Sequence, residues 1–147
     1  MIRLQDFAGL WSMAREIEDL RAGAFSELTG TCRFVAEEGG GLQQHEQGLL
    51  HLPGRQTPLQ AERRYIWRST APHEVARDIS VFFDDGRFFH SFDPNTSKPK
   101  AAHACAPDAY EVQYDFSDWP VWQADWRVTG PRKDYLSRSV FRPAQGG

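Results

Sequence analysis

Short segments in which apolar and polar residues alternate dominate the chain from about residue 24 onward. Such alternation is typical of β-strands with one buried face, because successive side chains of a strand point to opposite sides. Turn-forming residues separate the segments, and the clearest turn is Asp84-Asp85-Gly86, where Asp-Gly supplies the positive φ angles of a tight hairpin. No helical pattern alternates with the strands. The sequence therefore predicts an antiparallel all-β fold and excludes a parallel α/β fold.

We expect about eight to nine strands. The segments run over residues 28–36, 42–52, 61–67, 75–83, 87–92, 101–116, 119–129 and 133–142, with one more after Gly9. Residues 4–8 are expected to form a short helical turn, although a helix over residues 4–20 stays open because apolar residues there also recur at helical spacing. The polar segment 93–100 is rich in turn formers and is long enough to cover or gate one end of the fold.

Polar and aromatic residues share the faces of several expected strands, as in Arg63, Tyr65 and Trp67. This mixture favours an up-and-down β-barrel whose lumen holds water or a polar ligand over a sandwich with one apolar seam. The length of 147 residues suits a single domain, which we place at residues 1–143, with a flexible tail at residues 144–147.

Charge and cysteine usage limit the classes of partner. The net charge is −3 and no run of Lys or Arg occurs, so we expect neither nucleic acid nor a membrane surface as a partner. Cys32 and Cys105 are the two cysteines, which indicates free thiols in a reducing compartment. With no signal peptide visible at the N-terminus, we predict a cytoplasmic protein. A homodimer remains open.

Two sets of residues resemble known families. Gly9-Leu10-Trp11 resembles the Gly-X-Trp signature of the calycins, the lipocalin and fatty-acid-binding-protein superfamily of up-and-down barrels. This resemblance implies that Trp11 packs across the closed end of the barrel, under Arg138 or Arg142 of the last strand.

The second set covers more of the chain and resembles a bacterial domain family of unknown function with a calycin-like barrel. It consists of Arg63-X-Tyr65-X-Trp67, Asp85-Gly86-Arg87-X-Phe89-His90, His103-X-Cys105-X-X-Asp108-X-Tyr110, Trp126-X-Val128 and Gly130-Pro131-Arg132-Lys133-Asp134. The resemblance implies a fold and no activity.

The residues favour a binding protein over an enzyme, with a small anionic ligand that is partly apolar or aromatic. An aromatic wall with a few polar groups is the usual build of a small-molecule pocket. Arg132 and Lys133 sit in the turn between the last two strands, where they could clamp an anion at the rim or form a surface ion pair with Asp134. Arg63 could instead form an ion pair with Asp108 or Glu111. The lumen candidates are Arg63, Tyr65, Trp67, His90, His103, Tyr110 and Arg127.

The same residues also allow other functional interpretations. An isomerase, cyclase or hydrolase would use His90, His103 and Asp108 as acid and base groups. His90, His103 and Cys105 also suggest three alternatives, namely a metal site, a Cys–His nucleophile or a haem ligand. Their spacing matches no zinc pattern, and we expect no metal and no cofactor. A barrel with a filled lumen would be an interaction module with Trp119 and Trp122 exposed to a partner.

Overall fold

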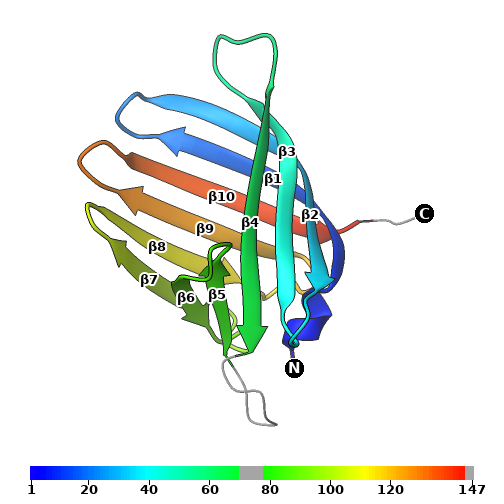
Figure 1. Ribbon diagram of the computed structural model, residues 1–147. Coiled ribbons are helices and arrows are strands. Elements are labelled where there is room, and N and C mark those ends of the chain that lie inside the picture. The colour runs from blue at the N-terminus through cyan, green and yellow to red at the C-terminus, as the bar shows by residue number, and fades with distance from the viewer. Residues whose placement is uncertain (70–77, 145–147) are drawn as a thin grey trace.

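Ten antiparallel strands form one sheet that rolls up into a nearly closed up-and-down barrel (Figure 1). The computed structural model describes residues 1–69 and 78–144. The order in the sheet is β6-β5-β4-β3-β2-β1-β10-β9-β8-β7, so the first and last strands pair in its middle. The predicted fold class is confirmed. The elements are η1 (Leu4–Phe7), β1 (Gly9–Asp19), β2 (Ala24–Ala36), β3 (Leu42–His51), β4 (Leu59–Ser69), β5 (Ile79–Phe83), β6 (Phe88–Phe92), β7 (Lys100–Cys105), β8 (Asp108–Asp115), β9 (Trp122–Thr129) and β10 (Asp134–Pro143).

The strand count differs from the expected eight to nine because segment 101–116 is a hairpin. β7 and β8 are joined at Ala106 and Pro107, and a proline cannot donate a ladder hydrogen bond, so it ends the strand. The short helical turn is confirmed as the 3-10 helix η1, followed directly by β1. The expected strand positions Val75 and Arg77, and residues 145–147 of the expected tail, lie outside the described residues.

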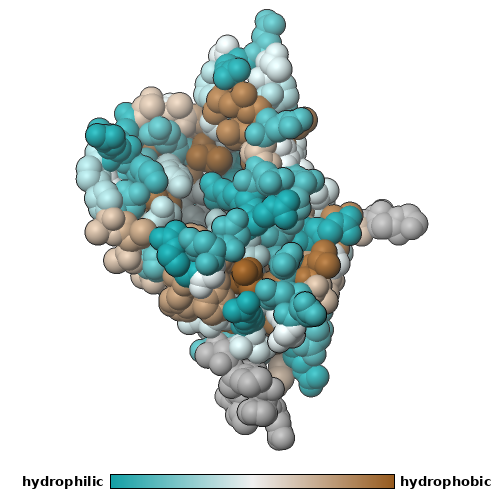
Figure 2. Space-filling view, viewed as in Figure 1, coloured by the Kyte–Doolittle hydropathy of each residue, from teal (hydrophilic) through white to brown (hydrophobic). Residues whose placement is uncertain are grey.

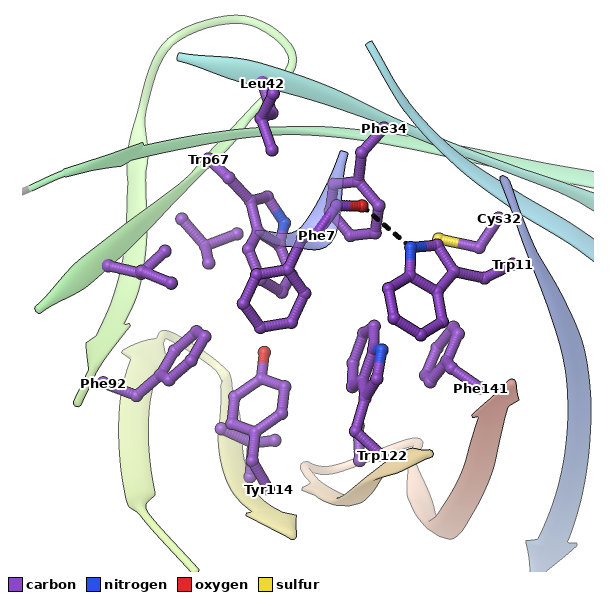
Figure 3. Packing of buried hydrophobic residues seen from close by; sticks show 14 of the residues in the cluster. Phe7, Trp11, Cys32, Phe34, Leu42, Trp67, Phe92, Tyr114, Trp122 and Phe141 are labelled. Carbon is purple, nitrogen blue, oxygen red and sulfur yellow. Dashed lines mark hydrogen bonds between the residues drawn. The ribbon is translucent and has the colours of Figure 1, made fainter. Parts of the chain in front are cut away.

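One end of the barrel is closed by η1. Phe7 is fully buried, and its ring lies 4.9 to 6.4 Å from six other aromatic rings contributed by β1, β2, β4, β9 and the segment between β8 and β9. Figure 3 shows this ring at the centre of the aromatic cluster. The polar segment 93–99 joins the same end, because the Asn95 side chain exchanges two hydrogen bonds with the backbone of Ile2, at 2.8 and 3.2 Å.

Trp11 packs at the closed end, but without a basic cover. Its indole Nε1 donates to the carbonyl of Phe7 at 2.8 Å, and its ring lies 5.7 Å from Trp119. The register places Arg142 opposite Ser12 and Arg138 opposite Glu16, at positions that face away from the lumen. The expectation that Arg138 or Arg142 covers Trp11 is therefore wrong, and aromatic rings take that place.

The barrel closes without a backbone ladder between β6 and β7, which are the two ends of the sheet in the described part of the chain. Side chains bridge this seam instead. His90 of β6 hydrogen-bonds to Tyr114 of β8 at 2.8 Å, and Phe92 stacks on Tyr114 with ring centroids 4.2 Å apart.

Strands β2 and β3 approach each other very closely. Gly30 of β2 stands opposite Gly48 of β3, and a Cβ on Gly30 would meet the Gln47 carbonyl. No helix among the described residues is long and apolar enough to cross a membrane.

Candidate ligand-binding site

The lumen contains two adjoining cavities between the aromatic cluster of the closed end and the open end. The two share Arg63, Tyr65, Phe89 and Trp126 in their walls. The deeper one has a volume of about 40 Å³. This is room for a few ordered waters. Figure 2 shows the surface hollowed beside the projecting β3–β4 hairpin, where the strands of the barrel end.

A buried ion pair lies in the wall of the deeper cavity. Arg15 of β1 donates through Nη2 to both carboxylate oxygens of Glu46 of β3, at 3.1 and 3.0 Å, and its Nε donates to Ser139 Oγ of β10 at 2.6 Å. All three residues are buried. Buried charges are tolerated when they are paired and hydrogen-bonded, and here both conditions are met.

Gln44 connects this ion pair to the closed end. Its amide donates to Glu46 Oε2 at 3.3 Å, while its carbonyl oxygen accepts a 2.6 Å hydrogen bond from the indole of Trp67. Trp67 is 2% exposed and packs on Phe34 and Phe7. Trp67, expected among the ligand contacts, therefore lies in the floor of the cavity. The sequence analysis missed Gln44, Glu46 and Arg15, although Arg15 alternates in phase with Trp11 and Met13 of the same strand.

Arg63 is a lumen cation without an anionic partner. It lines both cavities, it is accessible to solvent, and among the described residues no carboxylate lies within ion-pair distance of its guanidinium. Burial opposes its charge, but nearby Tyr65 and Glu46 outweigh that effect and raise the pKa of Arg63. Because Arg15 already neutralises Glu46, the charge of Arg63 is the unbalanced one.

The expected ion pairs of Arg63 are not formed. Asp108 binds Lys133 Nζ at 3.1 Å, and Glu111 stands at an exposed position opposite Arg127. The interpretation of Arg63 as a partner of Asp108 or Glu111 is therefore wrong.

Aromatic rings surround Arg63. Tyr65 stacks on Phe89 at 5.9 Å between ring centroids, and Phe89 stacks on Trp126 at 5.1 Å. Tyr110 meets the edge of Phe89 at 5.7 Å, so the structure brings together Arg63, Tyr65 and Tyr110 as the sequence analysis expected. Burial raises the pKa of Tyr65, whose hydroxyl stays neutral at physiological pH.

His90 lies deeper in the same cavity. It is 3% exposed, its Nε2 is 2.8 Å from the Tyr114 hydroxyl, and its Nδ1 has no hydrogen-bond partner among the described residues. Burial, together with the nearby His103, lowers the pKa of His90 to about 3, so the ring is neutral at physiological pH. His103 lies farther along the wall, with its ring 5.3 Å from Phe89.

Arg127 is placed outside the lumen. The flanking Trp126 and Val128 occupy the inward positions of β9, and Arg127 Nη2 binds Asp134 Oδ1 at 2.7 Å. The expectation that Arg127 lines the lumen is wrong, since strand alternation sends it to the other face. Arg132 and Lys133 are exposed in the turn between β9 and β10 at the open end. Asp134 pairs with Arg127 instead of orienting these two rim cations.

The alternative sites do not assemble as expected. Asp108 pairs with Lys133 at the rim, whereas His90 binds Tyr114 inside the barrel, so these candidates for acid–base catalysis have separate partners. The described residues hold no group of three His, Cys, Asp or Glu side chains arranged for a metal ion. Trp122 is 1% exposed and Trp119 packs on Phe7, so the expectation of an exposed Trp119–Trp122 partner surface is wrong.

Comparison with known proteins places this barrel in a family. Residues 7–143 match a family of unknown function, DUF6314. The chain belongs to this family. No curated protein matches the sequence. Among solved structures the DUF6314 barrel is similar to the S-type phycobiliprotein lyase CPES from Guillardia theta, with a TM-score of 0.70 and 8% identity, over 98% of this chain and 92% of that one. At this identity the likeness shows a shared calycin-like fold.

Proposed function

We propose that this barrel binds a small anion with an aromatic or apolar body in its lumen. The observation that carries the proposal is Arg63, a lumen cation that no carboxylate of the described residues neutralises and that stands among stacked aromatic rings. A guanidinium presents a rigid fork of donors that suits a carboxylate or phosphate, and mostly apolar walls with a few polar groups are typical of small-molecule sites.

The ligand would enter at the open end. Arg132 stands exposed at that rim, beside Lys133, which pairs with Asp108 at 3.1 Å, and the Arg132 guanidinium would attract an anion before it reaches Arg63. Since the volume of the deeper cavity is only about 40 Å³, a ligand would displace water and move the solvent-accessible Arg63 side chain. The aromatic side chains of the lumen wall would then pack against the aromatic body of the ligand.

The structural relative supports this proposal at the level of the fold. The phycobiliprotein lyase shares this barrel at 8% identity, and nothing of its reaction is transferred to this chain. From the sequence we still predict a cytoplasmic, bacterial protein that has no nucleic-acid partner and is monomeric or homodimeric. We propose no catalytic step, because His90, His103 and Asp108 do not share a common set of partners.

A pair of matched probes tests the proposal. Biphenyl-4-carboxylate and the neutral biphenyl-4-carboxamide share one aromatic body, and their affinities can be measured by calorimetry or by quenching of tryptophan fluorescence. We expect the carboxylate to bind more tightly, and Arg63→Gln to weaken it about tenfold, close to the loss of one charge-assisted hydrogen bond, with little effect on the amide.

Arg64→Gln is the control. Arg64 is the next residue of β4, its side chain is 52% exposed, and its 3.6 Å contact with Glu62 lies on the surface. The control should leave both affinities unchanged. Equal binding of the acid and the amide, or equal losses in the two variants, would refute the role of Arg63.

A further inference from the structure

Two residues in the wall of the deeper cavity have a ring nitrogen without a hydrogen-bond partner among the described residues, His90 at Nδ1 and Trp122 at Nε1, and only the imidazole nitrogen can either donate or accept. His90 is 97% buried, and while Nε2 contacts the Tyr114 hydroxyl, Nδ1 contacts no donor or acceptor among the described residues. Leaving a buried polar atom unsatisfied is costly, and native proteins do so rarely. The neighbouring polar groups offer no partner, because Arg15, Glu46 and Gln44 already bind one another.

The register sets the distance between His90 and Arg63 along the barrel wall. His90 stands opposite Val81, and Val81 stands opposite Trp67, so His90 lies level with Trp67. Arg63 precedes Trp67 by four residues on β4, toward the open end. At about 3.3 Å per residue the two levels are about 13 Å apart. Both residues line the same cavity, one near its mouth and one near its floor.

The chemistry of His90 restricts the group it can meet. A neutral imidazole has one N–H donor and one acceptor nitrogen, and the Tyr114 hydroxyl can take either role toward Nε2. Nδ1 is therefore a donor if the hydroxyl donates, and an acceptor if it accepts. A hydroxyl group on a ligand satisfies both cases, because it can donate or accept, whereas an anionic group can only accept.

We propose that the ligand is an elongated acid whose far end carries a neutral hydrogen-bonding group, such as a hydroxyl, and that this group contacts His90 Nδ1. The inference rests on the proposed function, since it assumes that the acid group lies at Arg63. It narrows the ligand class to molecules with an anion at one end, a flat apolar middle and a neutral polar group at the other end. His90 is then a residue that determines specificity.

The test compares biphenyl-4-carboxylate with 4′-hydroxybiphenyl-4-carboxylate, which adds one hydroxyl at the end opposite the acid. We expect the unmodified protein to bind the hydroxylated acid roughly three- to tenfold more tightly, the range of one buried hydrogen bond. His90→Phe keeps a flat ring of similar size and should abolish this preference while retaining the affinity for the plain acid. Arg63→Gln should weaken both acids by the same factor.

These outcomes separate the inference from the proposed function. Equal affinity for the two acids in the unmodified protein, or a preference that survives in His90→Phe, would overturn the role of His90 while leaving Arg63 intact. A preference that is lost in His90→Phe without any effect of Arg63→Gln would keep His90 and overturn the role of Arg63. Binding of neither acid would overturn both.

A second measurement needs no variant and covers the case in which His90→Phe does not fold. In protein labelled with ¹⁵N at histidine, the hydroxylated acid should shift the Nδ1 resonance of His90, and the plain acid should not. A water molecule held permanently at Nδ1 would give the same spectrum with either acid, and that result would contradict the inference.

Discussion

At the scale of single residues, the lumen combines groups that are fully satisfied with groups that are not. Arg15, Glu46, Gln44 and Trp67 form a continuous hydrogen-bonded chain along the barrel wall from β1 to β4. Among the described residues, Arg63 has no carboxylate within ion-pair distance and His90 Nδ1 has no hydrogen-bond partner. The first group stabilises the interior, and the second is free to meet a ligand.

The Arg15–Glu46 pair gives a prediction for stability. Glu46→Gln leaves Arg15 buried with a charge and no counter-ion, and breaking one partner of a buried pair costs about 3–5 kcal/mol. We expect urea denaturation at neutral pH to show a loss of this size. The control is Arg138→Gln, which breaks the 3.4 Å surface contact with Asp125, where the side chains are 67% and 43% exposed, and which should cost at most about 1 kcal/mol. Similar losses in the two variants would contradict the prediction.

His90 predicts how stability depends on pH. Its pKa is about 3 in the folded protein against an ordinary value of 6.5, so below pH 6.5 the unfolded chain takes up a proton that the folded protein does not. Stability is then lost as the pH falls, by about 2 kcal/mol at pH 5 relative to pH 7 or above. Urea unfolding at pH 7 and pH 5 measures this difference.

His90→Phe should remove most of this loss, because no buried imidazole remains to be protonated on unfolding. His51→Gln, at the exposed last position of β3, should retain it. The same loss in His90→Phe as in the unmodified protein would assign the pH dependence to other groups.

At the scale of the elements, the β6–β7 seam is the one break in an otherwise hydrogen-bonded wall of the described barrel. Both flanking strands are short, with five residues in β6 and six in β7. They are linked across the seam by rings, such as Phe89 and His103, and by the His90–Tyr114 hydrogen bond. Opening this seam breaks no backbone ladder.

Hydrogen exchange should reveal this difference between strands. Backbone amides that point into the seam have no ladder partner there, so we expect peptides from β6 and β7 to exchange well before peptides from β1 and β10. Mass spectrometry after a series of labelling times measures this order. Equal protection of the edge strands and of β1 would show that the seam is closed in solution.

Local sequence signals predict some of the strands and turns correctly and others incorrectly. The Asp84-Asp85-Gly86 turn and the strands on either side of it lie where alternation and turn chemistry predict them. The sequence predicts one strand over residues 101–116, and the structure divides this segment into β7 and β8. Pro107 was the signal that could have divided it, since proline is excluded from the interior of a paired strand.

At the scale of the whole molecule, η1 closes one end of the barrel and leaves the other end for a ligand. Phe7 carries this closure, because its fully buried ring is the centre of the aromatic cluster (Figure 3). The open end carries the β9–β10 turn with Arg132 and Lys133. The barrel therefore has a closed end and an open end, and the open end is where we propose that a ligand enters.

Removing the ring tests the importance of the closed end. Phe7→Ala should lower the free energy of unfolding by about 3–5 kcal/mol, the usual cost of deleting a buried aromatic side chain. Phe25→Ala is the control, because Phe25 is 60% exposed on the outer face of β2 and should change stability by at most about 0.5 kcal/mol. Urea denaturation measures both, and a loss below 1 kcal/mol in Phe7→Ala would show that η1 is dispensable for the fold.

The sequence by itself determined the fold class and that Arg63, Tyr65 and Trp67 share one face of their strand, because alternation is a local property that can be read residue by residue. Arg63 and Tyr65 were found in this way. The sequence did not determine that Arg127 faces outward, since alternation defines two faces of a strand without saying which face lies inside the barrel.

Only the tertiary structure decided which polar groups meet. Arg15 and Glu46 are 31 residues apart, and His90 and Tyr114 are 24 apart. These contacts depend on how ten strands curve and on which residues stand level across the lumen once β1 pairs with β10. The same closure leaves Arg63 without an ion-pair partner among the described residues, and so the proposed binding site is a property of the barrel rather than of any one strand.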